Sequence, residues 1–239
     1  MQNFFTPKEN FRLNHIILTG DEYYHAARSC RVKPGELIGV TDGAGRRVTA
    51  RISEIDSSSI KAEIEKDISG VGEPSLEITA AISLINPQRF ETAIEKCTEL
   101  GARHFIPVLT GRCEPNIKSR FRINRLERII LEAAKQSGRS FLPGISEITA
   151  LEDILNENNS VMLAASQKGE TGLRKMLSKP GLNRRITLII GPEGDFTEKE
   201  YRFFEKINAG LYSLGSLVLR TETAAITSVA LAVNSSGES

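Results

Sequence analysis

The residues best suited to chemistry lie in two short segments toward the carboxyl end of the chain. One is the motif Gly-Pro-Glu-Gly-Asp-Phe at residues 191–196, and the other is Leu-Arg-Thr-Glu-Thr at residues 219–223. The glycines of the first motif let backbone amides approach a bound ligand closely. The second segment sets one cation, Arg220, beside one carboxylate, Glu222. Such a pair either stabilises the fold or acts on a substrate.

Each segment is expected to follow a strand and to lead into a helix. The strands are predicted by the apolar runs at residues 186–190 and 211–214. Carboxyl ends of parallel strands meet at one edge of an open α/β sheet, where such proteins bind ligands. The two loops should therefore converge, which favours a functional role for Arg220 and Glu222 over a purely structural one.

The composition bounds the class of protein. The chain has 239 residues, of which 40% are hydrophobic and 26% charged, with a net charge of +1. We expect a well-cored globular protein of one or two domains. The three cysteines and three histidines show no metal-ligand spacing, so neither a structural metal nor disulfides are expected. No membrane span or signal peptide is expected either, which predicts a cytoplasmic protein.

The spacing of apolar residues along the sequence changes near residue 73, which predicts two domains. Residues 1–72 contain short strands separated by turns, as is typical of a small barrel. Within them, Asp-Gly-Ala-Gly at residues 42–45 predicts a hairpin. Residues 70–75 form the expected linker. Residues 74–239 alternate apolar runs with helical spacing, which predicts an α/β domain with a parallel sheet and crossover helices.

Start and stop signals outline the elements of the second domain. A strand is expected at residues 76–85, followed by a helix at 89–100 that ends at Gly101. Further strands are expected at residues 104–109, 161–165, 186–190 and 211–214.

Polar spacing predicts where the remaining helices begin and end. Asn-x-x-Glu at residues 124–127 and Thr-x-x-Glu at 197–200 predict capped starts, and Gly138 predicts an end. Residues 224–233 are apolar nearly all round, so we expect a helix buried on several sides. Such a helix lies either in the core or at a dimer interface.

Cations gather between Arg112 and Arg139. This stretch holds eight Lys and Arg residues against three Glu residues, in a chain that is otherwise nearly neutral. The excess predicts either a surface that contacts phosphates or an ordinary solvated helix face. Charge alone does not separate these alternatives.

The motifs together closely resemble those of the bacterial 16S ribosomal RNA uracil-N3 methyltransferases, a family of the SPOUT class that uses S-adenosylmethionine. The blocks that carry the resemblance lie at residues 3–5, 25–31, 33–35, 41–43, 89, 95–101, 132–139, 142–143, 191–194 and 219–224. They run through nearly the whole chain. The family usually has a second glycine after Gly194, where this chain has Asp195.

The resemblance implies a fold and a set of partners. Residues 1–72 would form a PUA-like RNA-binding β-barrel, and residues 74–239 a SPOUT α/β domain with a trefoil knot. The family's substrate is 16S ribosomal RNA, free or in the small ribosomal subunit. A homodimer is implied, with no membrane and no metal. The cofactor would be S-adenosylmethionine.

The resemblance also implies catalytic residues. Methylation at N3 needs the methyl group held in line with the nitrogen, and it needs the N3 proton removed or the resulting anion stabilised. Arg220 would donate to a uracil carbonyl without itself titrating. Glu222 would orient Arg220 or accept the proton. An ion pair at the start of a helix remains the alternative for these two residues.

The remaining implied site residues fall into two groups. The cofactor residues come from three loops and act mostly through their backbone: Ala164, Ala165, Ser166, Gly191, Pro192, Glu193, Gly194, Leu214, Gly215, Leu219, Thr221 and Ala224. The RNA-binding residues are Arg28, Arg31, Arg125, Gln136 and Arg139. Arg28 and Arg31 suit phosphates better than bases. Gln136 and Arg139 either line the RNA entrance or only end a helix.

Two other functions are compatible with the motifs. One is a methyltransferase of the same class that acts on transfer RNA. The other is a non-catalytic RNA-binding or ribosome-assembly protein that retains the fold. Arg220 and the glycine loop at residues 191–194 argue against the second, because a binding module needs neither.

Overall fold

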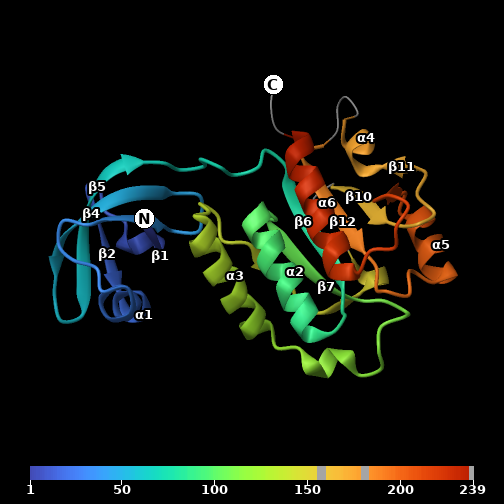
Figure 1. The fold of residues 1–239 in the computed structure, drawn as a ribbon, viewed down its shortest axis with the longest axis horizontal. Helices are drawn as coiled ribbons and strands as arrows, with labels where there is room; N and C mark the ends of the chain where they lie inside the picture. The colour runs from blue at the N-terminus through green and yellow to red at the C-terminus, as the bar shows by residue number, and fades with distance from the viewer. Residues whose placement is uncertain (155–159, 179–182, 237–239) are drawn as a thin grey trace. The chain divides into compact units, whose positions relative to one another are not determined.

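The computed structural model describes residues 1–154, 160–178 and 183–236, which form two compact units (Figure 1). The first unit contains Met1–Glu73 and Leu131–Leu142, and the second contains Pro74–Ile130 and Pro143–Ser239. The division after Glu73 falls inside the expected linker. Residues 131–142, which the sequence analysis assigned to the second domain, belong to the first unit.

A sheet of parallel strands forms the centre of the second unit. Its strands are β6 (Glu77–Ser83), β7 (His104–Leu109), β8 (Gly144–Ile145), β9 (Thr149–Ala150), β10 (Val161–Ala165), β11 (Thr171–Gly172), β12 (Arg185–Ile190) and β13 (Gly210–Ser213). They lie in the order β11-β13-β10-β12-β6-β7-β8, with β9 also paired to β7. Every pairing is parallel, so the carboxyl ends share one edge. The strands expected from the apolar runs are confirmed.

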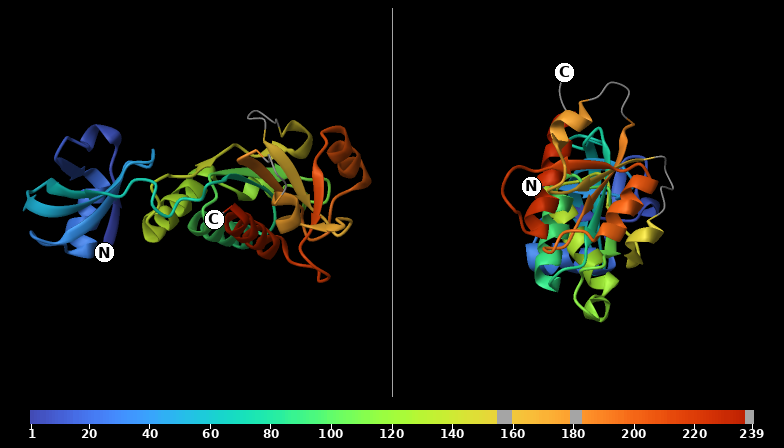
Figure 2. Two further views of the ribbon diagram at one scale, coloured as in Figure 1. Left: turned by 90° about the horizontal axis from the view of Figure 1, so that it is seen from above. Right: turned by 90° about the vertical axis from the view of Figure 1, so that its right-hand side faces the viewer.

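Helices cover both faces of this sheet. They are α2 (Pro87–Leu100), α4 (Leu173–Leu177), α5 (Glu198–Lys206) and α6 (Thr221–Ser236). A further helix, α3 (Ile123–Ser137), begins in the second unit and ends in the first. Helix α6 lies against α2 and over β6 and β12 (Figures 1 and 2). Helix α5 packs through Tyr201 and Phe204 on Ala81 and Ile189, whose side chains point to the opposite face from those of Ala80 and Leu188.

The expected helix signals are confirmed at three places and wrong at one. Gly101 ends α2 with φ 115°, Gly138 ends α3 with φ 69°, and a capping box formed by Thr197 and Glu200 opens α5. The cap of α2, Asn86, was not expected. Helix α3 begins at Ile123 instead of after Asn124. Its first hydrogen bond is accepted by the carbonyl of Arg122, so Asn124 lies inside the first turn and is no cap.

The first unit is built on a five-stranded sheet in the order β1-β3-β4-β5-β2. The strands are β1 (Gln2–Phe5), β2 (His15–Thr19), β3 (Leu37–Thr41), β4 (Arg47–Ile55) and β5 (Ser59–Asp67). Thr6, directly after β1, donates its N–H to Thr41 of β3 at 3.0 Å and its hydroxyl to Ile17 of β2 at 2.9 Å. The edges of the sheet are thereby linked around a core that includes Phe4, Leu18 and Ile52.

The hairpin predicted at residues 42–45 is present and has a second role. The Asp42 carboxylate accepts from the N–H groups of Ala44 and Arg46 at 2.8 and 3.0 Å, which stabilises the turn between β3 and β4. The turn also pairs with the chain that follows α3, since the N–H of Gly45 donates to Ser140 at 3.0 Å. A short α-helix, α1 (Gly20–Tyr24), and one π-type turn (His25–Cys30) occupy a stretch for which no helix was expected.

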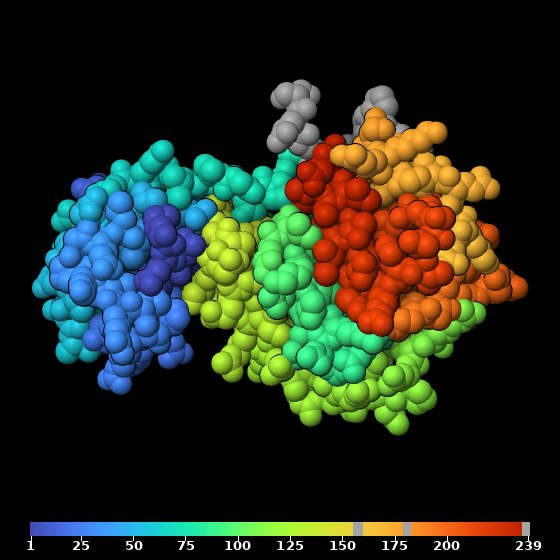
Figure 3. All heavy atoms as spheres, viewed as in Figure 1, coloured from blue at the N-terminus to red at the C-terminus, as the bar shows by residue number. Residues whose placement is uncertain are grey.

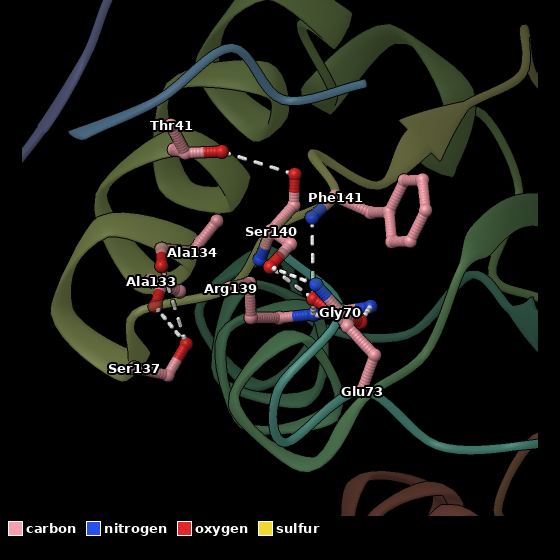
Figure 4. Close-up of polar contacts among 9 residues, drawn as sticks. All are labelled: Thr41, Gly70, Glu73, Ala133, Ala134, Ser137, Arg139, Ser140 and Phe141. Carbon is pink, nitrogen blue, oxygen red and sulfur yellow. Dashed lines mark hydrogen bonds and ion pairs between the residues drawn. The ribbon is translucent and has the colours of Figure 1, made fainter. Parts of the chain in front are cut away.

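Buried charges hold residues 131–142 in the first unit (Figure 4). Helix α3 ends at Gly138 as expected, with φ 69°. The Arg139 guanidinium then donates to Glu73 at 2.8 Å, and these side chains are only 5% and 10% exposed. The same carboxylate accepts from the backbone N–H groups of Ser140 and Phe141 at 2.7 and 3.1 Å. Lys135 forms a comparable buried pair with Glu22 at 2.8 Å.

The environment of Glu73 fixes its charge. Burial alone would raise the pKa of this carboxyl. The hydrogen bonds and charge of Arg139, together with the two backbone N–H groups, outweigh burial and lower the pKa below its ordinary value.

We expect Glu73→Gln to lower the free energy of unfolding of the first unit by about 3 kcal/mol, because it leaves the buried Arg139 charge without a counterion. Glu65→Gln, which breaks the exposed pair with Arg51, should cost less than about 0.5 kcal/mol. Hydrogen exchange of the β3 and β4 amides in denaturant measures both. The Glu73 contribution should be present above its unfolded pKa of about 4.3 and lost as the pH falls through the lower folded value. Equal effects of the two variants would contradict this role for Glu73.

Candidate active site

The turn after β12 is shaped by one buried aromatic ring. Phe196 is 2% exposed and meets Phe204 of α5 edge-on, with ring centroids 4.8 Å apart. A Cβ added at Gly191 would lie 3.0 Å from the Phe196 ring, so a glycine allows the turn to close over it. The turn is completed by Asp195, whose N–H donates to the Pro192 carbonyl at 2.9 Å. Asp195 takes a left-handed conformation with φ 64°.

The segment between β13 and α6 is fixed at both of its ends. Before it, the buried Tyr212 hydroxyl donates to Ser228 of α6 at 2.8 Å. After it, the Thr221 hydroxyl donates to the Gly191 carbonyl at 3.0 Å, which joins the start of α6 to the turn after β12. The chain between these anchors is exposed at residues 215–218 and at Arg220. It stands at the surface, coloured orange-red before α6, in Figure 3.

A relay of hydroxyl groups connects the end of β10 to the turn after β12. The N–H of Lys168 donates to the Ser166 hydroxyl at 3.0 Å, which lies 2.6 Å from the Tyr201 hydroxyl. Tyr201 in turn donates to the Asp195 carboxylate at 2.9 Å. Burial raises the pKa of Tyr201 to about 12, so its proton stays in place at neutral pH. Asp195, the residue that departs from the family pattern, is therefore held by a specific partner.

The three segments surround one pocket at the carboxyl edge of β10, β12 and β13. All the expected cofactor residues line it except Ala164 and Gly194. Ala164 is fully buried beneath the pocket, and Gly194 turns toward Arg112, because an added Cβ would lie 3.2 Å from that side chain.

Six lining residues were not expected from the sequence. They are Gln167, Ile190, Asp195, Ser213, Leu217 and Val218. Each lies within two positions of an expected residue in the chain, so treating each loop as one continuous lining segment would have included them. Leu217 and Val218 are 79% and 73% exposed, although both are large and apolar.

Arg220 and Glu222 form no ion pair with each other in the part of the chain that the structure describes, so the alternative of an ion pair between them at the start of a helix is wrong. Among the described residues, Glu222 forms its ion pair with Arg89 of α2, at 3.8 Å from Nε. Arg89 also donates to Glu193 at 3.1 Å, so it connects α6 to the turn after β12. The other oxygen of Glu222 is buried and has no hydrogen-bond partner in the part of the chain that the structure describes. Arg220 is exposed and forms no ion pair with any residue that the structure describes.

The expected RNA-binding residues differ in whether their side chains are exposed and able to contact RNA. In the first unit, Arg28 and Arg31 are exposed, with the Arg28 guanidinium 5.1 Å from the centre of the Tyr24 ring. Gln136 is exposed as well, whereas the Arg139 charge is buried against Glu73. In the second unit, Arg125 is exposed at the surface but donates to Glu91 at 2.8 Å.

In the part of the chain that the structure describes, no helix is long and apolar enough to cross a membrane. The same residues contain no cluster of His, Cys, Asp or Glu side chains that could hold a metal ion.

Comparison with known proteins assigns the chain to a family. Residues 72–233 match the RNA methyltransferase domain family, and residues 18–65 match the RNA methyltransferase PUA domain family. The chain is 32% identical over 219 residues to a ribosomal RNA small subunit methyltransferase E from Rickettsia conorii, covering 90% of this chain and 88% of the relative. The chain belongs to the ribosomal RNA small subunit methyltransferase E family.

Solved structures of similar proteins agree with this assignment. A ribosomal RNA small subunit methyltransferase E from Neisseria gonorrhoeae, bound to S-adenosylmethionine, is 28% identical with a TM-score of 0.83. It covers 96% of this chain and 95% of its own. A methyltransferase of Legionella pneumophila in complex with the same cofactor is 27% identical with a TM-score of 0.81, covering 96% of both chains. The methyltransferase E family fold therefore extends over both units of this chain.

The bond from Thr221 to Gly191 predicts a measurable effect on the pocket. Thr221→Val keeps the shape of the side chain but leaves the partly buried Gly191 carbonyl without this donor, which should cost about 1–3 kcal/mol. Hydrogen exchange should become faster in residues 214–224 and stay unchanged in β7. Thr223→Val, at an exposed position two residues further along α6, is the matched control. If both variants exchange alike, Thr221 does not hold the two segments together.

Proposed function

We propose that this protein transfers the methyl group of S-adenosylmethionine to N3 of a uridine in 16S ribosomal RNA. The observation that carries the proposal is the pocket at the carboxyl edge of β10, β12 and β13, found in a chain of the methyltransferase E family. Relatives of this family have been solved with S-adenosylmethionine bound. The uracil-N3 position and the SPOUT class rest on the motifs described above.

The chemistry of the pocket fits S-adenosylmethionine. The two charged side chains that line it, Glu193 and Asp195, are both carboxylates, which suits a cofactor with a sulfonium cation. Apolar side chains for a flat adenine ring are supplied by Ile190, Leu214 and Leu219. Backbone groups at the remaining expected positions would hold the ribose and the amino-acid part. When bound, the cofactor supplies an electrophilic methyl group.

The residues of the chain have to activate the uracil. A new bond from N3 to the methyl carbon forms as the carbon–sulfur bond breaks, and the electron pair of that bond stays on sulfur. The N3 proton must also leave. We propose that the Glu222 carboxylate accepts it, because one oxygen of this carboxylate has no hydrogen-bond partner among the described residues. Arg220 would donate to a uracil carbonyl, where negative charge develops. Its exposure and freedom from ion pairs support this role.

The finer features of the fold belong to the same proposal. A PUA-like barrel in the first unit is supported by the link that Thr6 makes between the edges of its sheet. A trefoil knot in the second unit and a homodimer are what the resemblance implies, and light scattering in solution tests the dimer. A ribosomal RNA substrate would place the protein in the cytoplasm.

Nucleoside mass spectrometry tests the function directly. Small ribosomal subunits and 16S RNA from a strain that lacks the gene would be incubated with the protein and labelled S-adenosylmethionine. Labelled 3-methyluridine is the expected product, and transfer RNA is the control substrate. Label in transfer RNA alone would favour a transfer RNA methyltransferase. Cofactor binding without label in any RNA would favour a non-catalytic protein.

Arg220→Ala should lower the turnover number on the order of 100-fold, because it removes a donor that acts on charge developing in the transition state. The affinity for S-adenosylmethionine should change by no more than a few-fold, since Arg220 does not line the pocket. Turnover assays and calorimetry measure the two quantities. Arg202→Ala, which removes an exposed cation from α5, is the control. Near-normal turnover of Arg220→Ala would exclude this role.

Arg31→Ala should weaken RNA binding and reduce the slope of log affinity against log salt by roughly 0.7–0.9, because each phosphate contact releases counterions. Arg125→Ala should change the slope less, since Glu91 already neutralises that guanidinium. The hydrogen bond from Arg125 lowers the pKa of Glu91, so this carboxylate stays charged and competes with an RNA phosphate for the guanidinium. RNA titrations across a salt series measure the slope, with Arg51→Ala as the control. A wild-type slope for Arg31→Ala would assign Arg31 to ordinary solvated surface.

A further inference from the structure

A second hollow adjoins the cofactor pocket at the turn after β12. It has a volume of about 270 Å³ and lies where β6, β7 and β12 end. Its walls come from residues 84–86 and Arg89 after β6, from residues 112–114 and 117 after β7, and from Pro192 and Glu193 after β12.

The two hollows adjoin each other. Pro192 and Glu193 line both of them, so the two spaces meet along the turn at residues 191–194. Methyl transfer requires the acceptor atom to come within about 3–3.5 Å of the methyl carbon. The acceptor must therefore bind in a space that borders the cofactor pocket, as this hollow does.

The two arginines that line the hollow are in different electrostatic states. The charge of Arg89 is opposed by Glu193 at 3.1 Å and by Glu222 at 3.8 Å. Arg112 donates instead to the backbone carbonyl of Gly194 and forms no ion pair with the residues that the structure describes. Its side chain is exposed. The hollow therefore contains one guanidinium that forms no ion pair with a described residue, and its N–H groups not bonded to Gly194 can donate to a ligand.

We infer that this hollow receives the uracil base of the target nucleotide, and that Arg112 donates to O4, the carbonyl oxygen next to N3 that cytosine lacks. The inference rests on the proposed function and adds a binding site and a residue to it. Uracil carries a carbonyl on each side of N3, and loss of the N3 proton spreads negative charge onto both oxygens. A fixed guanidinium is a strong donor to such an oxygen. Cytosine has an amino group in place of this carbonyl, so its N–H donors would face the N–H donors of Arg112 and no hydrogen bond could form.

The Arg112→Ala variant tests this inference through base selectivity. Two short RNAs would compete with the substrate, one with the target uridine and one with cytidine in its place. The wild-type protein should prefer the uridine RNA by at least about ten-fold, and Arg112→Ala should lose this preference. The turnover number of Arg112→Ala should also fall on the order of 100-fold. The affinity for S-adenosylmethionine, measured by calorimetry, should stay within a few-fold. Arg185→Ala, at the amino end of β12 and outside both hollows, is the matched control.

Cys113→Met tests the hollow without a change of charge. The Cys113 thiol lines the hollow and donates to the Leu84 carbonyl at 3.3 Å, so a longer side chain should occupy part of the space. We expect the KM for RNA to rise by about ten-fold or more with cofactor affinity unchanged. Wild-type selectivity and turnover in both variants would overturn the assignment of the hollow. A wild-type protein that binds the cofactor but methylates no RNA would overturn the proposed function and this inference with it.

Discussion

The site depends on the hydrogen bond from the Thr221 hydroxyl to the Gly191 carbonyl. This bond joins the first turn of α6 to the turn after β12, two segments that the parallel sheet brings to the same edge. Tyr212 secures the other end of the connection through Ser228. The exposed chain between these two anchors then has only limited freedom, although almost none of its own side chains is buried.

The turn after β12 separates two spaces of different electrostatic character. On one side, the charged lining residues are the carboxylates Glu193 and Asp195, which favour a cationic ligand. On the other side lies Arg112, whose charge no described carboxylate opposes in an ion pair. Arg89 connects the two sides, because its partners Glu193 and Glu222 belong to the turn and to α6. We place the methyl donor and the acceptor in adjoining spaces that meet along this short turn.

Local sequence signals predicted the frame of the second unit well. The apolar run before Gly191 forms a strand, Gly101 ends a helix, and Thr197 caps one, because each signal acts through neighbouring residues. The walls of the cofactor pocket were predictable for the same reason, since each follows directly from a strand end. The proposed cap at Asn124 failed because the helix starts earlier, with Arg122 accepting its first hydrogen bond.

Partners distant in the chain could not be predicted. Arg220 and Glu222 are neighbours in sequence, yet Glu222 pairs with Arg89, which α2 brings alongside α6. Arg139 belongs to a basic stretch that suggested an RNA contact, but Glu73 from the linker buries its charge. Arg112 follows β7 in a segment without periodic pattern, so only the folded chain brings it to Gly194.

The adjacency of cofactor and target base along the turn after β12 is the feature on which the proposed chemistry depends. It can be tested by photo-cross-linking the full-length protein, in the presence of S-adenosylmethionine, to RNA that carries 4-thiouridine at the target position. Mass spectrometry of the digested complex would identify the attached peptide. The account predicts cross-links within residues 84–89 or 112–117. Cross-links confined to the first unit, or to residues 164–167 inside the proposed cofactor pocket, would contradict it.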